Sequence, residues 1–316
     1  MRKRIVSVVI PCLNCFETIG RCVLSLKDQH LPEGVELEVI AVDNGSTDGS
    51  LEALQRLPLR LVQEARRGPA AARNAGVRSA RGEVIVFLDA DTRPASRELI
   101  AEHLRTLSLA DEIGISGGAI SPDPEQKSWI AFAENATGLF NWHDGLPARF
   151  LSFQPTGNLA FRRAVYDRVG PLHEGLFWLE DFEWNMRVQK AGYKIFFNPK
   201  AGVYIWGRES LPAALTKFYA WGLNIWKIYV PGRTDQVWLC KNQRYFFCIN
   251  IPLRILNETY VTVKRWIRRC PVKTLCLIPL FLLFRSVWGL GILQGTRKGV
   301  SHNGIREDFR SVKSSE

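Results

Sequence analysis

Short apolar runs alternate with amphipathic stretches through the first 120 residues, and this alternation constrains the fold more than any other feature. The runs are rich in β-branched side chains and occupy residues 5–10 (IVSVVI), 37–42 (LEVIAV), 59–63 (LRLVQ) and 84–88 (VIVFL). The amphipathic stretches between them occupy residues 18–28, 50–57 and 69–79. Strands that alternate with helices in this way form a mostly parallel, Rossmann-like sheet with helices on both faces. We therefore expect an α/β fold.

Polar residues follow three of these runs at the point where each predicted strand ends. They are Pro11, Asn14 and Glu17 after the first run, Asp43 after the second, and Asp89 and Asp91 after the fourth. Ligands of such sheets bind beyond the carboxyl ends of the strands, so these side chains are candidates for a common site. Two carboxylates at a strand end suit Mg²⁺ or Mn²⁺, which leave coordination positions for the phosphates of a substrate.

The common phosphate-binding loops are absent from the sequence. Neither G-x-G-x-x-G after the first run nor G-x-x-x-x-G-K-[ST] occurs, so dinucleotide-binding and P-loop interpretations are excluded. Phosphate charge would then be met by a metal ion and by arginines. Arg66, Arg67 and Arg73 lie at the start of the predicted helix 69–79, where free N–H groups favour anions. We expect a functional part for Arg73, whereas Arg66 and Arg67 could equally solvate the helix end.

The charge of the chain is distributed unevenly. The 316 residues include 42 Lys and Arg and 31 Asp and Glu, a net charge of +11. Residues 1–206 hold 24 basic and 25 acidic side chains, and residues 207–300 hold 15 and 3. A neutral domain followed by a cationic, apolar segment does not favour a nucleic-acid partner. The seven cysteines form neither a disulfide framework nor a second ligand pair behind Cys12 and Cys15, so we expect a reducing compartment and no zinc site.

The segment after residue 210 has features of a membrane-associating region. Residues 211–230 form an amphipathic aromatic pattern, which we expect to pack against the sheet domain. Residues 264–269 (KRWIRR) place basic side chains just before the apolar residues 275–293, which are long enough for one bilayer span. Pro279 and Arg285 argue against crossing, so an interfacial or re-entrant helix on an anionic membrane surface is expected. A buried helix of a soluble unit is the alternative.

Six motifs follow one another in a fixed order. They read VSVVIPxxN at residues 6–14, VDNGSTD at 42–48, ARNAG at 72–76, FLDAD at 87–91, TGNLAFR at 156–162 and LEDFEW at 179–184, with Arg187 and residues 191–193 (AGY) behind. Together they resemble the family-2 glycosyltransferases, of the type that builds bacterial cell-surface polysaccharides and glycolipids. Members of this family are inverting enzymes with the glycosyltransferase A-type fold. The resemblance covers roughly residues 5–230.

The resemblance implies roles for individual positions. Asp43 would read the nucleobase of a nucleotide-sugar donor, most simply a UDP-sugar, in a pocket with Pro11, Asn14, Glu17 and Arg73. Asp89 would contact the donor ribose or sugar, and Asp91 would hold Mg²⁺ or Mn²⁺ on the diphosphate. Asp181 would be the general base, with Glu180, Gly157 and Asn158 on the acceptor and sugar side. One departure concerns the histidine that relatives often carry near the last strand, because residues 203–208 (VYIWGR) contain none. His143 could approach the metal instead, although a lone loop histidine is more often a hydrogen-bonding surface residue.

These observations predict a metal-dependent, inverting hexosyltransferase. Residues 1–120 would form its nucleotide-sugar-binding half, residues 121–230 its acceptor-binding half, and residues 231–316 a basic, apolar helical extension. The acceptor would be a glycan or a polyprenyl-phosphate-linked glycan, at the cytoplasmic side of the cell membrane in a peripheral or re-entrant attachment. A carboxylate that activates the acceptor, without a second one as nucleophile, predicts a single inverting displacement.

Two other functions fit parts of the sequence. Residues 84–92 superficially match the aspartyl-phosphate strand of phosphohydrolases, with Asp89 as nucleophile. However, Thr92 follows Asp91 directly, whereas those enzymes place one residue between the second Asp and the Thr. The other alternative is a catalytically degenerate glycosyltransferase-like protein that serves as a membrane-bound partner, which the missing histidine favours and the intact pair Glu180–Asp181 does not.

Overall fold

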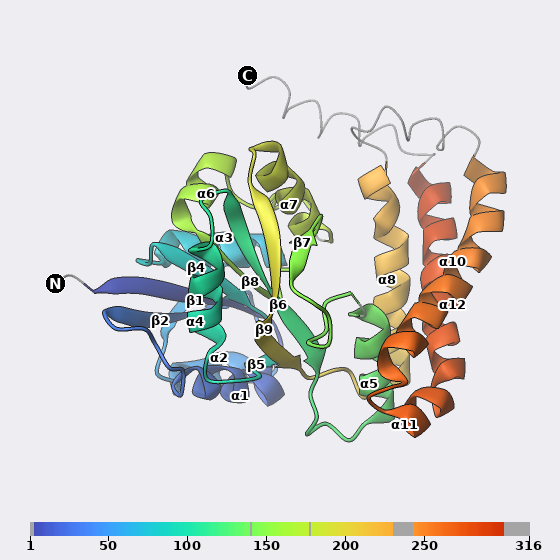
Figure 1. The fold of residues 1–316 in the computed structure, drawn as a ribbon, viewed down its shortest axis with the longest axis horizontal. Helices are drawn as coiled ribbons and strands as arrows, with labels where there is room; N and C mark the ends of the chain where they lie inside the picture. The colour runs from blue at the N-terminus through green and yellow to red at the C-terminus, as the bar shows by residue number, and fades with distance from the viewer. Residues whose placement is uncertain (1–2, 140, 177, 230–242, 300–316) are drawn as a thin grey trace. The chain divides into compact units, whose positions relative to one another are not determined.

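The computed structural model describes residues 3–139, 141–176, 178–229 and 243–299 (Figure 1). The chain forms two compact units. One, the sheet unit, comprises Met1–Gln126 and Asn141–Gly207, and the other, the helical unit, comprises Lys127–Phe140 and Arg208–Glu316. These divisions differ from the expected ones at residues 120 and 230. Residues 231–242 and 300–316 of the expected extension lie outside the described residues.

A nine-stranded sheet forms the centre of the sheet unit, with the strand order β3-β2-β1-β4-β8-β6-β9-β5 and β7 beside β9. The four apolar runs predicted from the sequence all form strands, here β1 to β4. The strands are β1 (Arg4–Cys12), β2 (Val35–Asp43), β3 (Arg60–Gln63), β4 (Val84–Leu88), β5 (Thr92–Pro94), β6 (Ile113–Pro122), β7 (Arg149–Leu151), β8 (Asn158–Arg162) and β9 (Lys194–Ile205).

The sheet is parallel in its first half and mixed in its second. β3, β2, β1 and β4 are mutually parallel, as expected for strands joined by helical crossovers. β8 then runs antiparallel to both β4 and β6, and β5 and β7 run antiparallel to β9. In the register of β4 and β8, Leu88 lies opposite Asn158. The antiparallel β8 therefore begins beside the carboxyl end of β4, which is where the predicted site lies.

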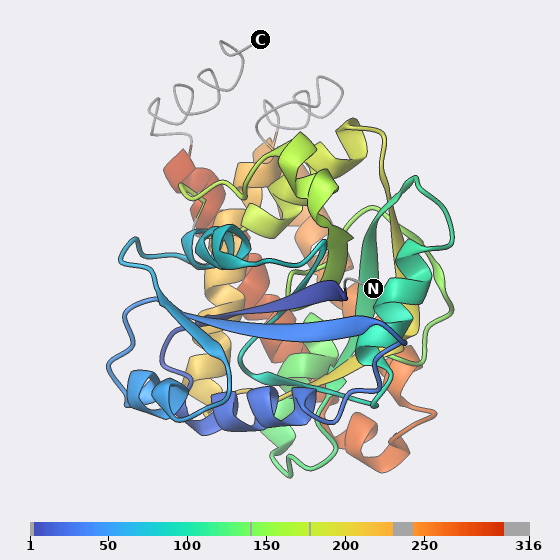
Figure 2. The ribbon, with the colours of Figure 1, turned by 90° about the vertical axis from the view of Figure 1, so that its left-hand side faces the viewer.

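Helices cover both faces of this sheet. α1 and α2 lie on one face of β1 and β2, and α3 lies on the other (Figures 1 and 2). α3, α6 and α7 share one hydrophobic core with the strands, in which Phe87, Phe161 and Trp184 are fully buried. The helices are α1 (Phe16–Leu26), α2 (Ser50–Gln55), α3 (Pro69–Ser79), α4 (Leu99–Leu107), α6 (Arg163–Val169) and α7 (Glu180–Lys190).

The helical unit has a hydrophobic core of its own, to which Phe132, Phe218, Phe281 and Phe284 contribute. α8 was expected to pack against the sheet domain, but in the structure it belongs to the helical unit and packs along α12. The Phe218 and Phe284 rings stack with centroids 4.8 Å apart at this contact. The helices are α5 (Trp129–Gly138), α8 (Leu211–Tyr229), α10 (Gln243–Trp266), α11 (Pro271–Cys276) and α12 (Ile278–Gly299).

The apolar run at residues 275–293 does not form one continuous helix. α11 ends at Cys276 and α12 begins at Ile278, with Pro279 in the first turn, where a proline is tolerated. The window Ile278–Gly295 of α12 is long and apolar enough to cross a membrane, as are the buried core helices of many soluble proteins. Arg285 within it is buried, and its Nη1 lies 2.7 Å from Glu258 Oε2 on α10. The charge of Arg285 is therefore neutralised inside the helical unit.

Candidate active site

Arg73 lies at the centre of the candidate site and joins residues from three elements. The side chain extends from α3 and is 6% exposed. Its Nη2 donates to Asp89 Oδ1 at 2.8 Å, and its Nη1 donates to Glu180 Oε1 at 2.9 Å. The acid after β4 and the acid that begins α7 are thus held by a single guanidinium. Arg73 was expected beside a nucleobase, and the structure gives it these two carboxylates as partners.

Glu180 and Asp181 form the first turn of α7, after Leu179 in a left-handed backbone conformation (φ 77°). Burial and the neighbouring Asp181 carboxylate raise the pKa of Glu180 to about 8, although Arg73 acts in the opposite direction. Burial also raises the pKa of Asp181, against the effects of Arg73 and of the Phe182 N–H, which donates to Asp181 Oδ1 at 2.8 Å. Glu180 is thus the buried partner of Arg73, whereas Asp181 is only partly buried.

Gly157 leaves the space that the Asp89 side chain occupies. The Asp89 N–H donates to the Gly157 carbonyl at 3.3 Å, just before β8 begins. A Cβ atom on Gly157 would lie 2.7 Å from Asp89 Oδ2, which is closer than real Cβ contacts. The backbone at Gly157 has no positive φ, so space and not conformation requires the glycine.

Asn158 was expected to face the acceptor or sugar, but its side chain is fully buried. Its Nδ2 donates to the carbonyls of Ala119 and Ala201 at 2.9 and 2.8 Å, and its Oδ1 lies 3.0 Å from His103 Nε2. Burial lowers the pKa of His103 to about 4, so this histidine is neutral near pH 7. The Asn158 side chain therefore ties β8 to its neighbours and has no exposed surface with which to bind a sugar.

The expected nucleobase pocket lies at the ends of β1 and β2, where Cys12 and Asp43 are paired in register. The Asp43 carboxylate is almost buried and accepts hydrogen bonds from the backbone N–H groups of Gly45 and Ser46. Asn14 is exposed, has φ 50°, and accepts the Thr47 N–H at 2.9 Å. Pro11 is partly buried and Glu17 is exposed. The structure brings this group to one sheet edge, and its contact with a nucleobase stays a prediction.

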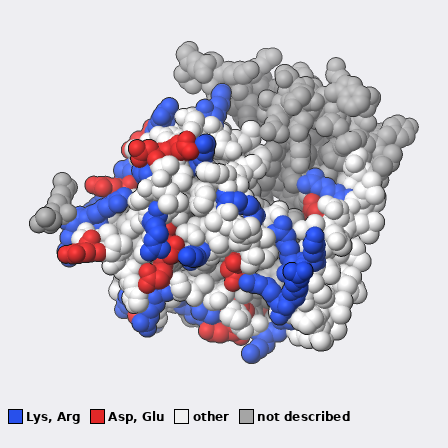
Figure 3. Space-filling model, in the orientation of Figure 1, with Lys and Arg blue, Asp and Glu red and all other residues white. Residues whose placement is uncertain are grey.

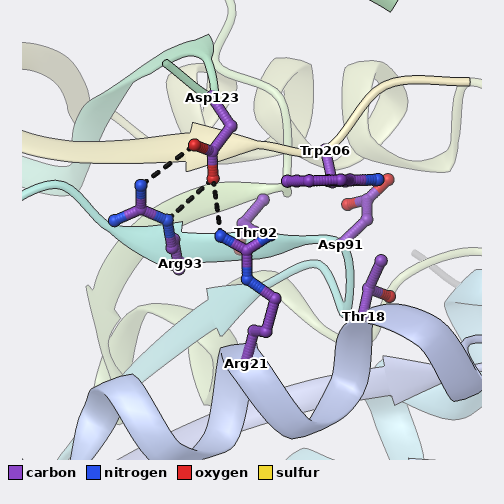
Figure 4. A pocket seen from close by; sticks show the side chains of 7 residues that line it. All are labelled: Thr18, Arg21, Asp91, Thr92, Arg93, Asp123 and Trp206. Atoms are coloured by element: carbon purple, nitrogen blue, oxygen red, sulfur yellow. Dashed lines mark hydrogen bonds and ion pairs between the residues drawn. The ribbon is translucent and has the colours of Figure 1, made fainter. Parts of the chain in front are cut away.

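Asp91 lines a small pocket on the same sheet edge, and Figure 4 shows how its side chains lie. The almost fully buried Asp123 accepts from Arg93 Nε at 2.7 Å and lies 3.6 Å from Arg21 Nη2. The Arg21 guanidinium stacks 4.4 Å from the centre of the Trp206 ring. The backbone N–H of Trp206 donates to the Asp91 carbonyl at 2.8 Å, which fixes the backbone of Asp91. The pocket is lined by Thr18, Arg21, Asp91, Thr92, Arg93, Asp123 and Trp206.

The donor atoms of this pocket fit an ion that shares its ligands with a substrate. Asp91 and Thr18 supply a carboxylate and a hydroxyl, which are the hard oxygen ligands that Mg²⁺ and Mn²⁺ prefer. Among the described residues no group of three or more His, Cys, Asp and Glu side chains is arranged to hold a metal. Mg²⁺ usually binds through one or two carboxylates together with substrate phosphates, so the donor set fits such an ion and not a closed protein cage.

Two asparagines in the motifs, Asn44 and Asn74, have structural roles that the sequence did not reveal. Asn74 Oδ1 accepts from the Tyr166 hydroxyl and the Leu172 N–H, so it joins α3 to α6 and the following loop. Asn44 Nδ2 donates to the carbonyls of Glu64 and Arg66, and Asn44 Oδ1 accepts the Gly68 N–H. Both asparagines position the segments on either side of Arg73. No local pattern signals such contacts, because every partner lies at least 20 residues away.

No histidine among the described residues lines the pocket. None of its seven lining residues is a histidine, and Trp206 stands in the segment where a histidine was expected. His143, the suggested substitute, is buried, and its Nδ1 accepts the Gly145 N–H at 3.0 Å. His143 thus accepts a hydrogen bond within its own loop, as the alternative predicted, but it is buried and not on the surface.

Comparison with known proteins decides the family. The model of "Glycosyl transferase family 2" matches residues 7–170, slightly more than half of the chain. The chain belongs to glycosyltransferase family 2. This assignment confirms the resemblance seen in the six motifs. The matched segment contains the strand-end acids, Arg73 and Gly157, and it ends before Glu180 and Asp181.

Relatives and solved structures agree with this assignment. Glycosyltransferase AglE of Haloferax volcanii is 28% identical over 61% of this chain and 64% of its own length. The chain thus matches less than two thirds of the length of that relative. A poly(ribitol-phosphate) beta-glucosyltransferase of Bacillus spizizenii is 32% identical over 36% of this chain and 20% of the relative's length. Mannosyltransferase PcManGT of Pyrobaculum calidifontis, solved with GDP-Man and Mn²⁺, superimposes with a TM-score of 0.60 at 20% identity, over 92% of this chain and 88% of that one.

A second solved structure has the same arrangement of helices and strands. S. aureus TarS 1–349 in complex with UDP-GlcNAc gives a TM-score of 0.54 at 17% identity, over 93% of this chain and 91% of that one. At these identities the likeness concerns the fold. The glycosyltransferase A-type fold expected from the motifs is therefore confirmed, and its sheet is mixed rather than mostly parallel.

Proposed function

We propose that this family-2 protein transfers a hexose, with inversion, from a nucleoside-diphosphate sugar to a hydroxyl of a glycan or of a polyprenyl-phosphate-linked glycan. The observation that carries the proposal is the bridge made by Arg73. It holds Asp89, at the carboxyl end of β4, and Glu180, at the start of α7, within 2.9 Å of one guanidinium. The acids that would face the donor and the acids that would face the acceptor therefore share one site.

The chemistry assigns Asp181 as the general base. It is the acid of the pair Glu180–Asp181 that Arg73 does not bind, and burial raises its pKa toward the range in which a base works near neutral pH. A hydroxyl deprotonated by Asp181 would attack the anomeric carbon from the side opposite the leaving nucleoside diphosphate. Since one carboxylate acts as base and none as nucleophile, a single displacement inverts the anomeric centre.

The donor would be bound along the sheet edge that runs from Asp43 to Asp91. Asp43, with Pro11, Asn14 and Glu17, would contact the nucleobase, and Asp89 the ribose or sugar. Asp91 would hold Mg²⁺ or Mn²⁺, and such a cation supplies neutralisation of the diphosphate leaving group. Solved relatives carry GDP-Man with Mn²⁺ in one case and UDP-GlcNAc in another, so both nucleotides are to be tested, UDP first.

The acceptor and the compartment are part of the same proposal. A relative named for glucosyl transfer to poly(ribitol phosphate) and others named as chondroitin synthases support a role in assembling a cell-surface polymer. The five cysteines that the structure describes are free thiols, as in a reducing compartment. We therefore place the reaction at the cytoplasmic side of the membrane.

The test separates binding from turnover and does not require a known acceptor. Thermal stability is measured with UDP-sugars and GDP-sugars, with and without Mn²⁺, where a ligand at 100 times its dissociation constant stabilises by about 2.7 kcal/mol. Release of nucleoside diphosphate, with water as acceptor, then reports turnover. We expect Asp181→Asn to lower the release rate roughly 10²- to 10⁴-fold, because the general base is removed, and to keep the donor-dependent thermal shift.

Glu183→Gln is the matched control. It removes a carboxylate from the same helix, two residues further on, where Glu183 pairs with Arg187 away from Arg73. Turnover of this variant should equal that of the unsubstituted protein. An Asp181→Asn protein with full turnover would show that the base is assigned wrongly, and release of phosphate from simple phosphoesters without a sugar donor would favour the phosphohydrolase instead.

A further inference from the structure

The first turn of α5 and the short helix α11 expose three large apolar side chains within the helical unit. Val272 is 71% exposed, Leu275 56% and Trp129 49%. Val272 and Leu275 are three residues apart and therefore lie on the same side of α11, whereas Thr274 between them is fully buried. One side of α11 thus packs inward and the other presents its apolar residues outward.

A lysine side chain connects these residues into one surface, here called the α5–α11 patch (Trp129, Val272 and Leu275). Lys273, between the two exposed residues of α11, places its Nζ 5.9 Å from the centre of the Trp129 ring and 4.3 Å from that of Phe132. The first turn of α5 therefore lies against α11. Single exposed hydrophobic residues are common on protein surfaces, but a contiguous group of this kind usually marks an interaction site.

The surroundings of the patch are strongly cationic. Residues 259–299 contain eight Lys and Arg and no Asp or Glu, and one of the eight, Arg285, is buried and paired with Glu258. Arg268 and Arg269 are exposed in the turn that leads into α11. Figure 3 shows Lys and Arg side chains over the region where Figure 1 places α5, and mostly uncharged residues where Figure 1 places α11. An exposed tryptophan beside aliphatic residues, with a rim of cations, is the composition of surfaces that lie in the headgroup region of a bilayer.

We propose that the α5–α11 patch docks the protein on an anionic lipid surface. Trp129, Val272 and Leu275 enter the boundary between headgroups and acyl chains, and the surrounding arginines and lysines contact the headgroup phosphates. A lipid surface fits better than an acidic protein partner, because the exposed apolar residues are few and the neighbouring residues 259–273 contain five Lys and Arg and no Asp or Glu.

Surface docking also fits the position of the charges in α12. Arg285, one of the basic residues of α12, lies inside the helical unit and pairs with Glu258, so its charge takes part in internal packing. The patch lies on α5 and α11, outside α12, and docking through it needs no helix to cross the bilayer. The proposal concerns the helical unit alone and is independent of the sugar transfer assigned to the sheet unit.

The experiment is co-sedimentation of the purified full chain with vesicles. Vesicles of phosphatidylcholine alone are compared with vesicles that also contain phosphatidylglycerol, at low and high salt. We expect binding to the anionic vesicles that weakens with salt. Leu275→Ser should reduce partitioning about ten-fold, because it removes apolar carbons from the inserted surface. Arg268→Glu should reduce it about five-fold or more, because each nearby cation attracts the leaflet.

Matched variants from the sheet unit act as controls. Leu109→Ser removes a leucine that is 61% exposed, close to the 56% of Leu275, and Arg56→Glu reverses an exposed arginine. Both should bind vesicles like the unsubstituted protein, and circular dichroism should show all four variants folded. Since vesicle binding is measured without a sugar donor, its outcome does not depend on the proposed transferase activity.

Three outcomes would overturn the proposal. Binding that survives Leu275→Ser but is lost in Leu256→Ser would place the contact on α10, where Leu256 is 60% exposed. Retention of the protein in cell membranes after alkaline carbonate extraction would assign α12 as a spanning helix. Self-association without vesicles that Leu275→Ser abolishes would assign the patch to a second copy of this chain.

Discussion

At the scale of single residues, the site depends on a position without a side chain. Gly157 lies against the Asp89 carboxylate, and a Cβ atom there would approach Asp89 Oδ2 to 2.7 Å. Asp89 also accepts a hydrogen bond from Arg73, so a displaced carboxylate would disturb the bridge to Glu180. Such a shift is costly for a buried or half-buried ion pair. A charge that loses its partner is still removed from water, and no attraction then offsets the free energy of that desolvation.

Gly157→Ala should therefore impair the site more than the fold. We expect donor binding and nucleoside diphosphate release to fall at least about ten-fold, and the free energy of unfolding to fall by about 1–3 kcal/mol from overpacking. Gly202→Ala is the control, because a Cβ atom on Gly202 would make only ordinary contacts at 3.5 Å or more. Donor titrations and denaturant unfolding of both variants measure the two effects. Unchanged donor binding in Gly157→Ala would contradict the expected displacement of Asp89.

At the scale of elements, the close approach of α3 to β1 sets the position of Arg73. Gly76 faces β1, and a Cβ atom there would lie 2.2 Å from Val9 Cγ1. α3 therefore packs with its backbone almost on the strand, and Arg73, one turn earlier, is directed across the strand ends. Gly76 lowers the helical propensity of α3. A glycine is nevertheless required there, because any larger residue would collide with β1.

The two helical glycines of α1 and α3 should respond to alanine in opposite directions. Gly76→Ala is expected to lower the free energy of unfolding by about 1–3 kcal/mol, because the added methyl meets Val9. Gly20→Ala, in α1, has nothing within 4 Å of the new Cβ and should raise it by about 0.5–1 kcal/mol through helical propensity. Urea denaturation of both variants measures the difference. A stabilised Gly76→Ala protein would show that α3 can move away from β1.

At the scale of the whole molecule, the pH dependence of stability sums over buried ionisable groups. His103 is fully buried between Ser116 Oγ and Asn158 Oδ1, and burial lowers its pKa from 6.5 to about 4. The unfolded chain thus binds a proton on His103 at a pH at which the folded protein does not. Stability is lost as the pH falls from about 6.5 to about 4. The pKa of Glu180 is raised in the folded protein, so Glu180 has the opposite effect. The folded protein keeps the proton of Glu180 to a higher pH than the unfolded chain does, and the stability that this proton gives is lost as the pH rises toward 8.

His103→Gln should remove the first of these two pH effects. A shift of this size corresponds to about 3 kcal/mol between pH 6.5 and pH 4, so stability curves of the variant should be flatter by roughly that amount over this range. Denaturant unfolding at several pH values measures it. Equal slopes for His103→Gln and the unsubstituted protein would refute the assignment of a neutral, buried His103.

Much of the fold follows from local sequence patterns. The apolar runs predict β1 to β4 within two residues at each end, because strands buried on both faces need continuous apolar residues. Gly68 and Pro69 likewise predict the first residue of α3. The antiparallel β8 was not predicted, since its pairing with β4 joins residues 70 or more positions apart. Asn158 is a second example. The motif TGNLAFR placed Asn158 at the site, but it did not predict that its side chain is buried.

The sequence by itself determined, to within about two residues, where β1 to β4 and α1 to α3 lie, and that acids and amides follow three strands of one sheet. Local periodicity and turn chemistry depend only on neighbouring residues, so they can be read along the chain. Only the tertiary structure decided that Arg73 bonds to Asp89 and Glu180, that Trp206 and Asp123 build the pocket around Asp91, and that α8 packs with α12. These contacts join residues far apart in the sequence, and the packing of whole elements selects them from many pairings that the same residue types allow.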